Sequence, residues 1–169
     1  MTIWVRPERQ TDVYIRRLIG CTNCWTKKGL LKTLSSTLRV YTARISYSGN
    51  DRLNITRKAN DPVGMAFAPS WDLLRSFLRL RREGKLTDSA WLQYRAHYTN
   101  EMQTSYENHR AIWCRVLDRK TVTFVCFCTN AAQCHRTILA ELFRTLGAGV
   151  IGERDVESRK SITGLLEVP

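Results

Sequence analysis

The stretch TVTFVCFCTNAAQCHRTILAELFRTLGAG, residues 121–149, decides the fold. Residues 121–128 form a run of apolar and β-branched side chains, which is typical of a strand buried on both faces of a parallel sheet. Residues 136–149 repeat apolar side chains at helical spacing up to Gly147, which predicts a helix. GVIGE, residues 149–153, predicts a short last strand. Strand, helix and strand in this order predict a parallel α/β unit with a right-handed crossover.

The segments before this stretch predict one further strand and a long helical section. Residues 38–50 alternate and end in Ser-Gly-Asn, as a strand and turn do, and residues 51–69 lack any period and are expected to be a loop. Helices are expected over residues 69–85, capped by Ser70, over 87–102 and over 105–120. We therefore predict a small Rossmann-like, three-layer α/β domain with a mostly parallel sheet over residues 38–169. Residues 1–37 are predicted to be a basic N-terminal extension.

Composition and charge limit the class of protein. The 169 residues are 43% hydrophobic and 25% charged, which is ordinary for a globular domain. No stretch approaches the roughly 20 apolar residues of a membrane helix, so no membrane partner and a cytoplasmic location are expected. The net charge of +12 predicts a polyanionic partner, a nucleic acid or a nucleotide, although such charge also serves solubility alone.

Cys126, Cys128, Cys134, His135 and Arg136 fall at the expected strand end and helix start. A loop there offers free backbone N–H groups to an anion, Arg136 can add a bidentate contact, and a thiol in that field becomes more acidic. Three interpretations compete with simple packing of cysteines in the core. They are a zinc site, a phosphate-loop thiolate enzyme, and an anion or nucleotide site.

The third interpretation is favoured over the other two. Zinc fits the residue types, but Cys126 and Cys128, two apart on a strand, would point to one helix-covered face, and the spacing is unfamiliar. A phosphate-loop enzyme of the tyrosine-phosphatase kind needs five residues between Cys and Arg, whereas seven separate Cys128 from Arg136. No metal and no cofactor are therefore predicted.

The same segment resembles a known family. VTFVCFCTNAAQCHRTILAELFRTLGAGVIGE is similar to the signature of the domain-of-unknown-function family 488 (DUF488), in which a buried strand ends in Cys and a short loop leads to Cys-His-Arg with Leu-Ala following. RISYSGNDRLNITRKA, FAPSWDLL and YTNEMQTSY resemble its phage and prokaryotic branch. The resemblance covers residues 38–153 and implies a small Rossmann-like α/β domain, without an established reaction.

The leading functional hypothesis is an enzyme of open reaction class that acts on a nucleotide, nucleobase or nucleic acid. Its candidate catalytic residues are Cys128, Cys134, His135 and Glu101, the last as an orienter of His135 or an acid/base. Replacing Cys134, His135 or Arg136 is expected to abolish activity while stability changes by about 1–2 kcal/mol at most. The candidate substrate- and anion-binding residues are Arg136, Arg44, Arg57, Lys58, Tyr47 and Trp71.

Two alternatives remain open. A non-catalytic nucleic-acid-binding accessory protein would use the arginines of residues 75–82 to follow a phosphate backbone. A zinc-stabilised interaction module would use the cysteines, and Cys21 and Cys24 also have the spacing of metal ligands.

Overall fold

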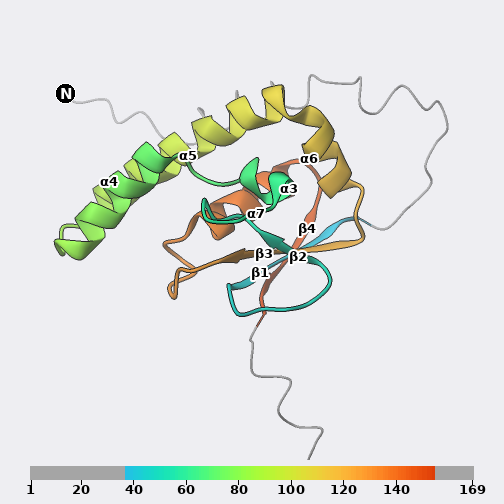
Figure 1. Cartoon of the computed structure of the whole chain (residues 1–169), viewed down its shortest axis with the longest axis horizontal. Helices are drawn as coiled ribbons and strands as arrows, with labels where there is room; N and C mark the ends of the chain where they lie inside the picture. The colour runs from blue at the N-terminus through green and yellow to red at the C-terminus, as the bar shows by residue number, and fades with distance from the viewer. Residues whose placement is uncertain (1–36, 155–169) are drawn as a thin grey trace, which may run out of the picture.

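Four parallel strands form one sheet in the part of the chain that the structure describes, residues 37–154 of a computed structural model (Figure 1). They are β1 (Arg39–Arg44), β2 (Arg52–Asn54), β3 (Thr121–Cys126) and β4 (Gly149–Glu153). Their order is β2-β3-β1-β4, and every neighbouring pair runs parallel. The predicted α/β class with a parallel sheet is therefore confirmed, and the apolar run of residues 121–126 is an inner strand.

The helices between the strands begin largely where the sequence predicts. They are α3 (Pro62–Met65), α4 (Trp71–Arg82), α5 (Asp88–Asn108), α6 (Arg110–Leu117) and α7 (His135–Thr145). The side chains of Ser70 and Thr87 accept the backbone N–H bonds that cap α4 and α5. Gly147 follows α7 with a φ of 93°, a left-handed conformation that glycine adopts without steric cost.

Two predictions about element boundaries are wrong. Residues 51–69 are not one loop, because they contain β2 and the short α3. The expected helix over residues 105–120 is divided, because α5 continues to Asn108 and the backbone of His109 (φ −121°, ψ 33°) breaks the helix before α6.

The helices of residues 37–154 all lie on one side of the sheet, the upper side in Figure 1. Val40, Val122 and Phe124 of the sheet pack there in one core with side chains from the helices and their connections, and the Phe67 and Trp113 rings meet at 4.8 Å. The described residues therefore form two layers, not the three that the sequence predicts. The physical reason is the seven-residue connection 45–51 between β1 and β2, which is too short to hold a crossover helix.

That connection crosses the opposite face of the sheet instead. Asp51 accepts hydrogen bonds from the hydroxyls of Tyr47 (2.7 Å) and Thr123 (2.9 Å), and it forms an ion pair of 3.2 Å with Arg154. Burial raises the pKa of Asp51, but the two hydroxyls and the guanidinium together lower it by more than burial raises it, so the pKa lies below its usual range. The loop is thus fixed to β3 and to the end of β4.

Some predictions concern residues outside this range. The extension over residues 1–37 and the Cys21–Cys24 pair lie outside the described residues, apart from Thr37, and the domain boundary stays a prediction. Within residues 37–154, no helix combines the length and apolar character that crossing a membrane requires.

Candidate functional site

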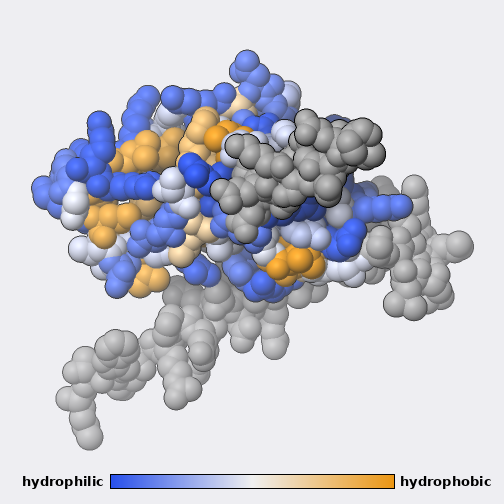
Figure 2. All heavy atoms as spheres, turned by 90° about the horizontal axis from the view of Figure 1, so that it is seen from below, coloured by the Kyte–Doolittle hydropathy of each residue, from blue (hydrophilic) through white to orange (hydrophobic). Residues whose placement is uncertain are grey.

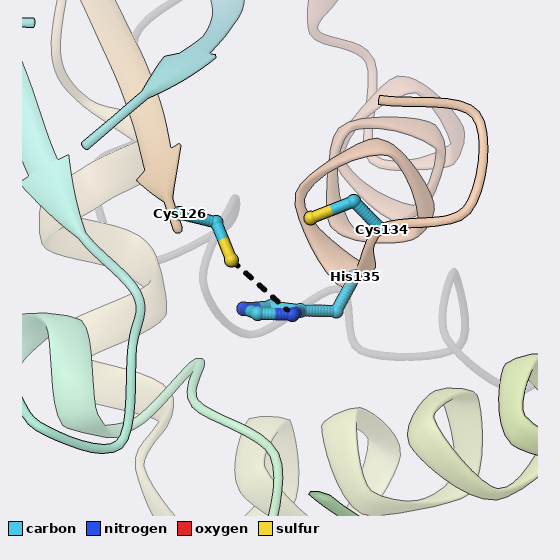
Figure 3. A group of neighbouring side chains, drawn as sticks. All are labelled: Cys126, Cys134 and His135. Atoms are coloured by element: carbon cyan, nitrogen blue, oxygen red, sulfur yellow. Dashed lines mark hydrogen bonds between the residues drawn. The ribbon is translucent and has the colours of Figure 1, made fainter. Parts of the chain in front are cut away.

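The cysteine-rich segment lies at the carboxyl edge of the sheet. Cys126 is the last residue of the inner strand β3, Cys134 is the N-cap of α7, and His135 is the first residue of that helix. Figure 3 shows the three side chains converging from the strand end and the helix start. Parallel α/β sheets bind ligands at this edge, next to helix N-termini.

The three sulfurs lie close together because β3 ends at Cys126. Residues that are two apart on a continuing strand lie about 6.6 Å from each other. The chain instead turns after the strand, and the Sγ atoms of Cys126 and Cys128 lie 3.8 Å apart. The sequence argument that placed both on one strand is therefore wrong. Cys126 and Cys134 are buried, whereas Cys128 is partly exposed.

The three clustered thiols have different pKa values. Hydrogen bonds from Cys126 and Cys134 hold the pKa of Cys128 well below its usual range, and the Arg81 guanidinium of α4 contributes in the same direction. The hydrogen bond with Cys128 raises the pKa of Cys126 although the one with Cys134 lowers it, and the pKa of Cys134 is raised by its hydrogen bonds with Cys126 and Cys128. Negative charge in the cluster therefore falls mainly on Cys128, its most accessible member.

His135 is buried with both ring nitrogens in contact with other groups. Nε2 lies 3.0 Å from the carbonyl oxygen of Ile55, which can only accept, so Nε2 carries the proton. Nδ1 then faces the Cys126 sulfur at 3.8 Å as an acceptor. Burial lowers the pKa of His135 to about 4, so the ring is neutral at physiological pH.

Arg136 is fully buried and holds the loop rather than facing solvent. Its Nη1 donates to the Cys128 carbonyl at 2.7 Å and to the Cys134 sulfur at 3.6 Å. Its Nη2 forms an ion pair of 2.6 Å with Glu153, at the end of β4. Both terminal nitrogens of the guanidinium bond protein groups in this structure, so the contact of Arg136 to an outside anion stays a prediction.

Comparison with protein-family models matches residues 26–147 to DUF488-N3a, described as the "Active DUF488-N3 subclade". The chain belongs to the DUF488 family. The match begins twelve residues before residue 38, where the sequence resemblance was expected to start. No curated protein and no solved structure matches the chain.

Two of the predicted site residues of this DUF488 domain hold a loop of the fold. Glu101 accepts the backbone N–H of Ser70 at 2.9 Å, and Arg57 donates to the carbonyls of Pro69 (2.7 Å) and Ala68 (2.6 Å). Glu101 is not the group that orients His135, because the Ile55 carbonyl has that place. A role of Glu101 as an acid or base stays a prediction.

The remaining predicted residues are dispersed. Arg44 is exposed and pairs in register with Cys126, so it lies at the same sheet edge. Lys58 is exposed in the connection after β2, and Trp71 is 43% exposed at the start of α4. Tyr47 lies in the loop on the opposite face, bound to Asp51, so the structure does not bring it to the cysteines.

Sequence reasoning missed four residues around the cluster. Ile55 and Glu153 bond His135 and Arg136 from 80 and 17 residues away, a separation that leaves no local signal. In the sequence, Arg81 is only one of the arginines of residues 75–82. Phe127, between two of the cysteines, is 56% exposed although its neighbours in the strand are buried, and the apolar run that contains it predicts burial instead.

Proposed function

We propose that this DUF488 protein is an enzyme acting on a nucleotide, nucleobase or nucleic-acid substrate, with Cys128 as its nucleophile. The observation that carries the proposal is that Cys128 alone of the three clustered thiols is partly exposed, on a loop that leads into the N-terminus of α7. Cys134, the other predicted nucleophile, is only 1% exposed and serves the cluster from inside. The family description as an active subclade supports an enzyme.

Positive charge around the loop supports an anionic substrate. Arg44 is exposed at the end of β1, Lys58 is exposed on the connection that follows β2, and Arg81 is exposed on α4. The N-terminus of α7 adds the positive end of a helix dipole. In Figure 2, hydrophilic residues dominate the face seen from below, and apolar residues form separate small patches. With a net charge of +12, the molecule attracts phosphates from a distance.

The buried residues have positioning roles in this proposal. Arg136 fixes the Cys128 carbonyl, and His135 fixes Cys126, whose thiol contacts the Cys128 sulfur. The Cys128 thiolate would form a bond to an electrophilic substrate atom while that atom's bond to its leaving group breaks, and the leaving group takes the electron pair. Water would then release the second product, giving its hydroxyl to the product and its other proton to the leaving group, which restores the Cys128 thiolate.

Trapping of a covalent adduct tests the proposal. Full-length protein is incubated with DNA and RNA oligonucleotides and with nucleotides, quenched in acid and weighed by intact-protein mass spectrometry. We expect an adduct on the wild type that maps to Cys128 and is absent from C128S. C114S is the matched control, because Cys114 lies on α6 outside the cluster. An adduct that persists in C128S would contradict the assignment.

A second candidate function is non-catalytic binding of nucleic acid, and the outer face of α4 favours it. Arg75, Arg79 and Arg82 are exposed, and an open cavity is lined by Arg75, Leu78, Arg81 and Arg82. This function predicts gel-shift affinity that falls steeply with salt and falls further on charge reversal of these arginines. C128S would bind normally. Salt-dependent binding without any adduct would favour this candidate over the enzyme.

A further inference from the structure

We propose that Cys126, Cys134 and His135 bind a zinc ion, with Cys128 as the fourth and most exposed ligand. The first three side chains are buried, and their ligand atoms all lie within 4.8 Å of one another (Figure 3). They come from the end of β3 and the start of α7, so the backbone of both elements fixes their positions. Cysteine and histidine in this combination are the usual donors of tetrahedral zinc sites.

Two distances from the Cys126 sulfur match a tetrahedral ion. Zinc–sulfur bonds of about 2.3 Å at tetrahedral angles place two sulfurs about 3.8 Å apart, and a sulfur and an imidazole nitrogen about 3.6 Å apart. The Cys126 sulfur lies 3.8 Å from the Cys128 sulfur and 3.8 Å from Nδ1 of His135. Both distances from Cys126 are therefore close to those that a shared ion imposes.

The groups around the ligands also suit a metal. A histidine that binds zinc typically donates its other N–H to a backbone carbonyl, which fixes the ring. Nε2 of His135 has this bond to Ile55 and leaves Nδ1 toward the sulfurs. Arg136 donates to the Cys134 sulfur at 3.6 Å, which holds that ligand in place, and its pairing with Glu153 balances its own charge.

The end of β3 at Cys126 removes the sequence objection to zinc. That objection assumed that Cys126 and Cys128 extend along one strand, whereas the strand ends between them. The zinc site rests on the proposed function only in that both involve Cys128. The ion would hold the Cys128 sulfur as a thiolate, the form in which cysteine acts both as ligand and as nucleophile. The metal can be measured without any substrate, so the two proposals fail separately.

Metal analysis of the full chain tests the inference. Protein purified without chelator or added metal is measured by inductively coupled plasma mass spectrometry, and we expect about one zinc per chain. Replacement by Co²⁺ should produce thiolate-to-cobalt charge-transfer absorption. Wild-type protein without zinc, and without this absorption after Co²⁺ addition, would overturn the inference, whereas the adduct test of Cys128 would remain open.

Variants locate the ion. C126S and C134S should lose zinc and the cobalt absorption, while C114S and the double variant C21S/C24S should keep both. If zinc is retained in C126S and C134S, or is lost only in C21S/C24S, the assigned site is wrong. If C126S or C134S does not fold, thiol titration of the wild type with and without chelator replaces it. Chelator should then expose additional reactive thiols, and an unchanged thiol count would refute the site.

Discussion

Replacement of Arg136 by Met should strongly destabilise the protein while keeping most of the apolar volume of the side chain. Arg136 is fully buried and makes charge-assisted bonds of 2.7 Å to the Cys128 carbonyl and 2.6 Å to Glu153. A hydrogen bond to a charged group contributes about 1.5–3 kcal/mol, and this range applies to the carbonyl. The side chain of Glu153 is 32% exposed and is hydrated again in the variant. The ion pair therefore contributes only about 0.5–1 kcal/mol, as surface ion pairs do.

The two contributions predict a loss of about 2–4 kcal/mol in the free energy of unfolding, which for a chain of this size lowers Tm by about 5–15 °C. This exceeds the small change that the sequence predicts, because the sequence does not reveal the burial. Thermal and urea unfolding followed by circular dichroism measure it. R144M is the matched control: Arg144 pairs with Glu141 at the same 2.6 Å, but on the surface, and should lose at most about 0.5 kcal/mol. Equal losses in the two variants would refute the reasoning.

Three further changes test the fold. Y98F should lose about 1–2 kcal/mol in urea unfolding, because the buried Tyr98 hydroxyl donates to the Phe67 carbonyl at 2.7 Å; an unchanged midpoint would exclude this bond. G64A should lose about 3 kcal/mol or more, because an added Cβ would lie 1.9 Å from the Asn54 carbonyl oxygen; wild-type stability would mean that these segments are not in contact. The lowered pKa of Asp51 stabilises the fold at pH values above the unfolded-state pKa of about 3.9, and this stabilisation is lost as the pH falls through the folded-state pKa. D51N should therefore be less stable than the wild type at pH 7, and the difference in stability should shrink below about pH 4. A difference that grows in acid would contradict the sign.

The elements that the sequence predicts well are those whose signals are local. Ser70 and Thr87 begin α4 and α5 because a hydroxyl side chain bonds the N–H groups of the next turn, and Gly147 follows α7 because it accepts a positive φ. β2 has no such signal. It has three residues with Leu53 alone fully buried, too few for a period, and its pairing partner β3 lies far along the chain.

The position of the site in the fold could be predicted from the sequence, but the burial of its side chains could not. The order of strand, loop and helix puts Cys126, Cys134 and His135 at the sheet edge, as the sequence implies. Their burial could not be predicted, because the groups that receive the His135 ring and the Arg136 guanidinium come from other strands' ends. A Cys-His-Arg tripeptide looks the same in sequence whether its polar groups face a substrate or the protein interior.

The two residues of the Arg136–Glu153 ion pair are synthesised at different times. Glu153 is the last residue of β4, so its carboxylate leaves the ribosome after every other part of the cysteine cluster has been made. A nascent chain that ends within α7 already contains the thiols and the imidazole but lacks the partner for the guanidinium beside them. The buried guanidinium therefore has its ion pair only once β4 has docked at the edge of the sheet.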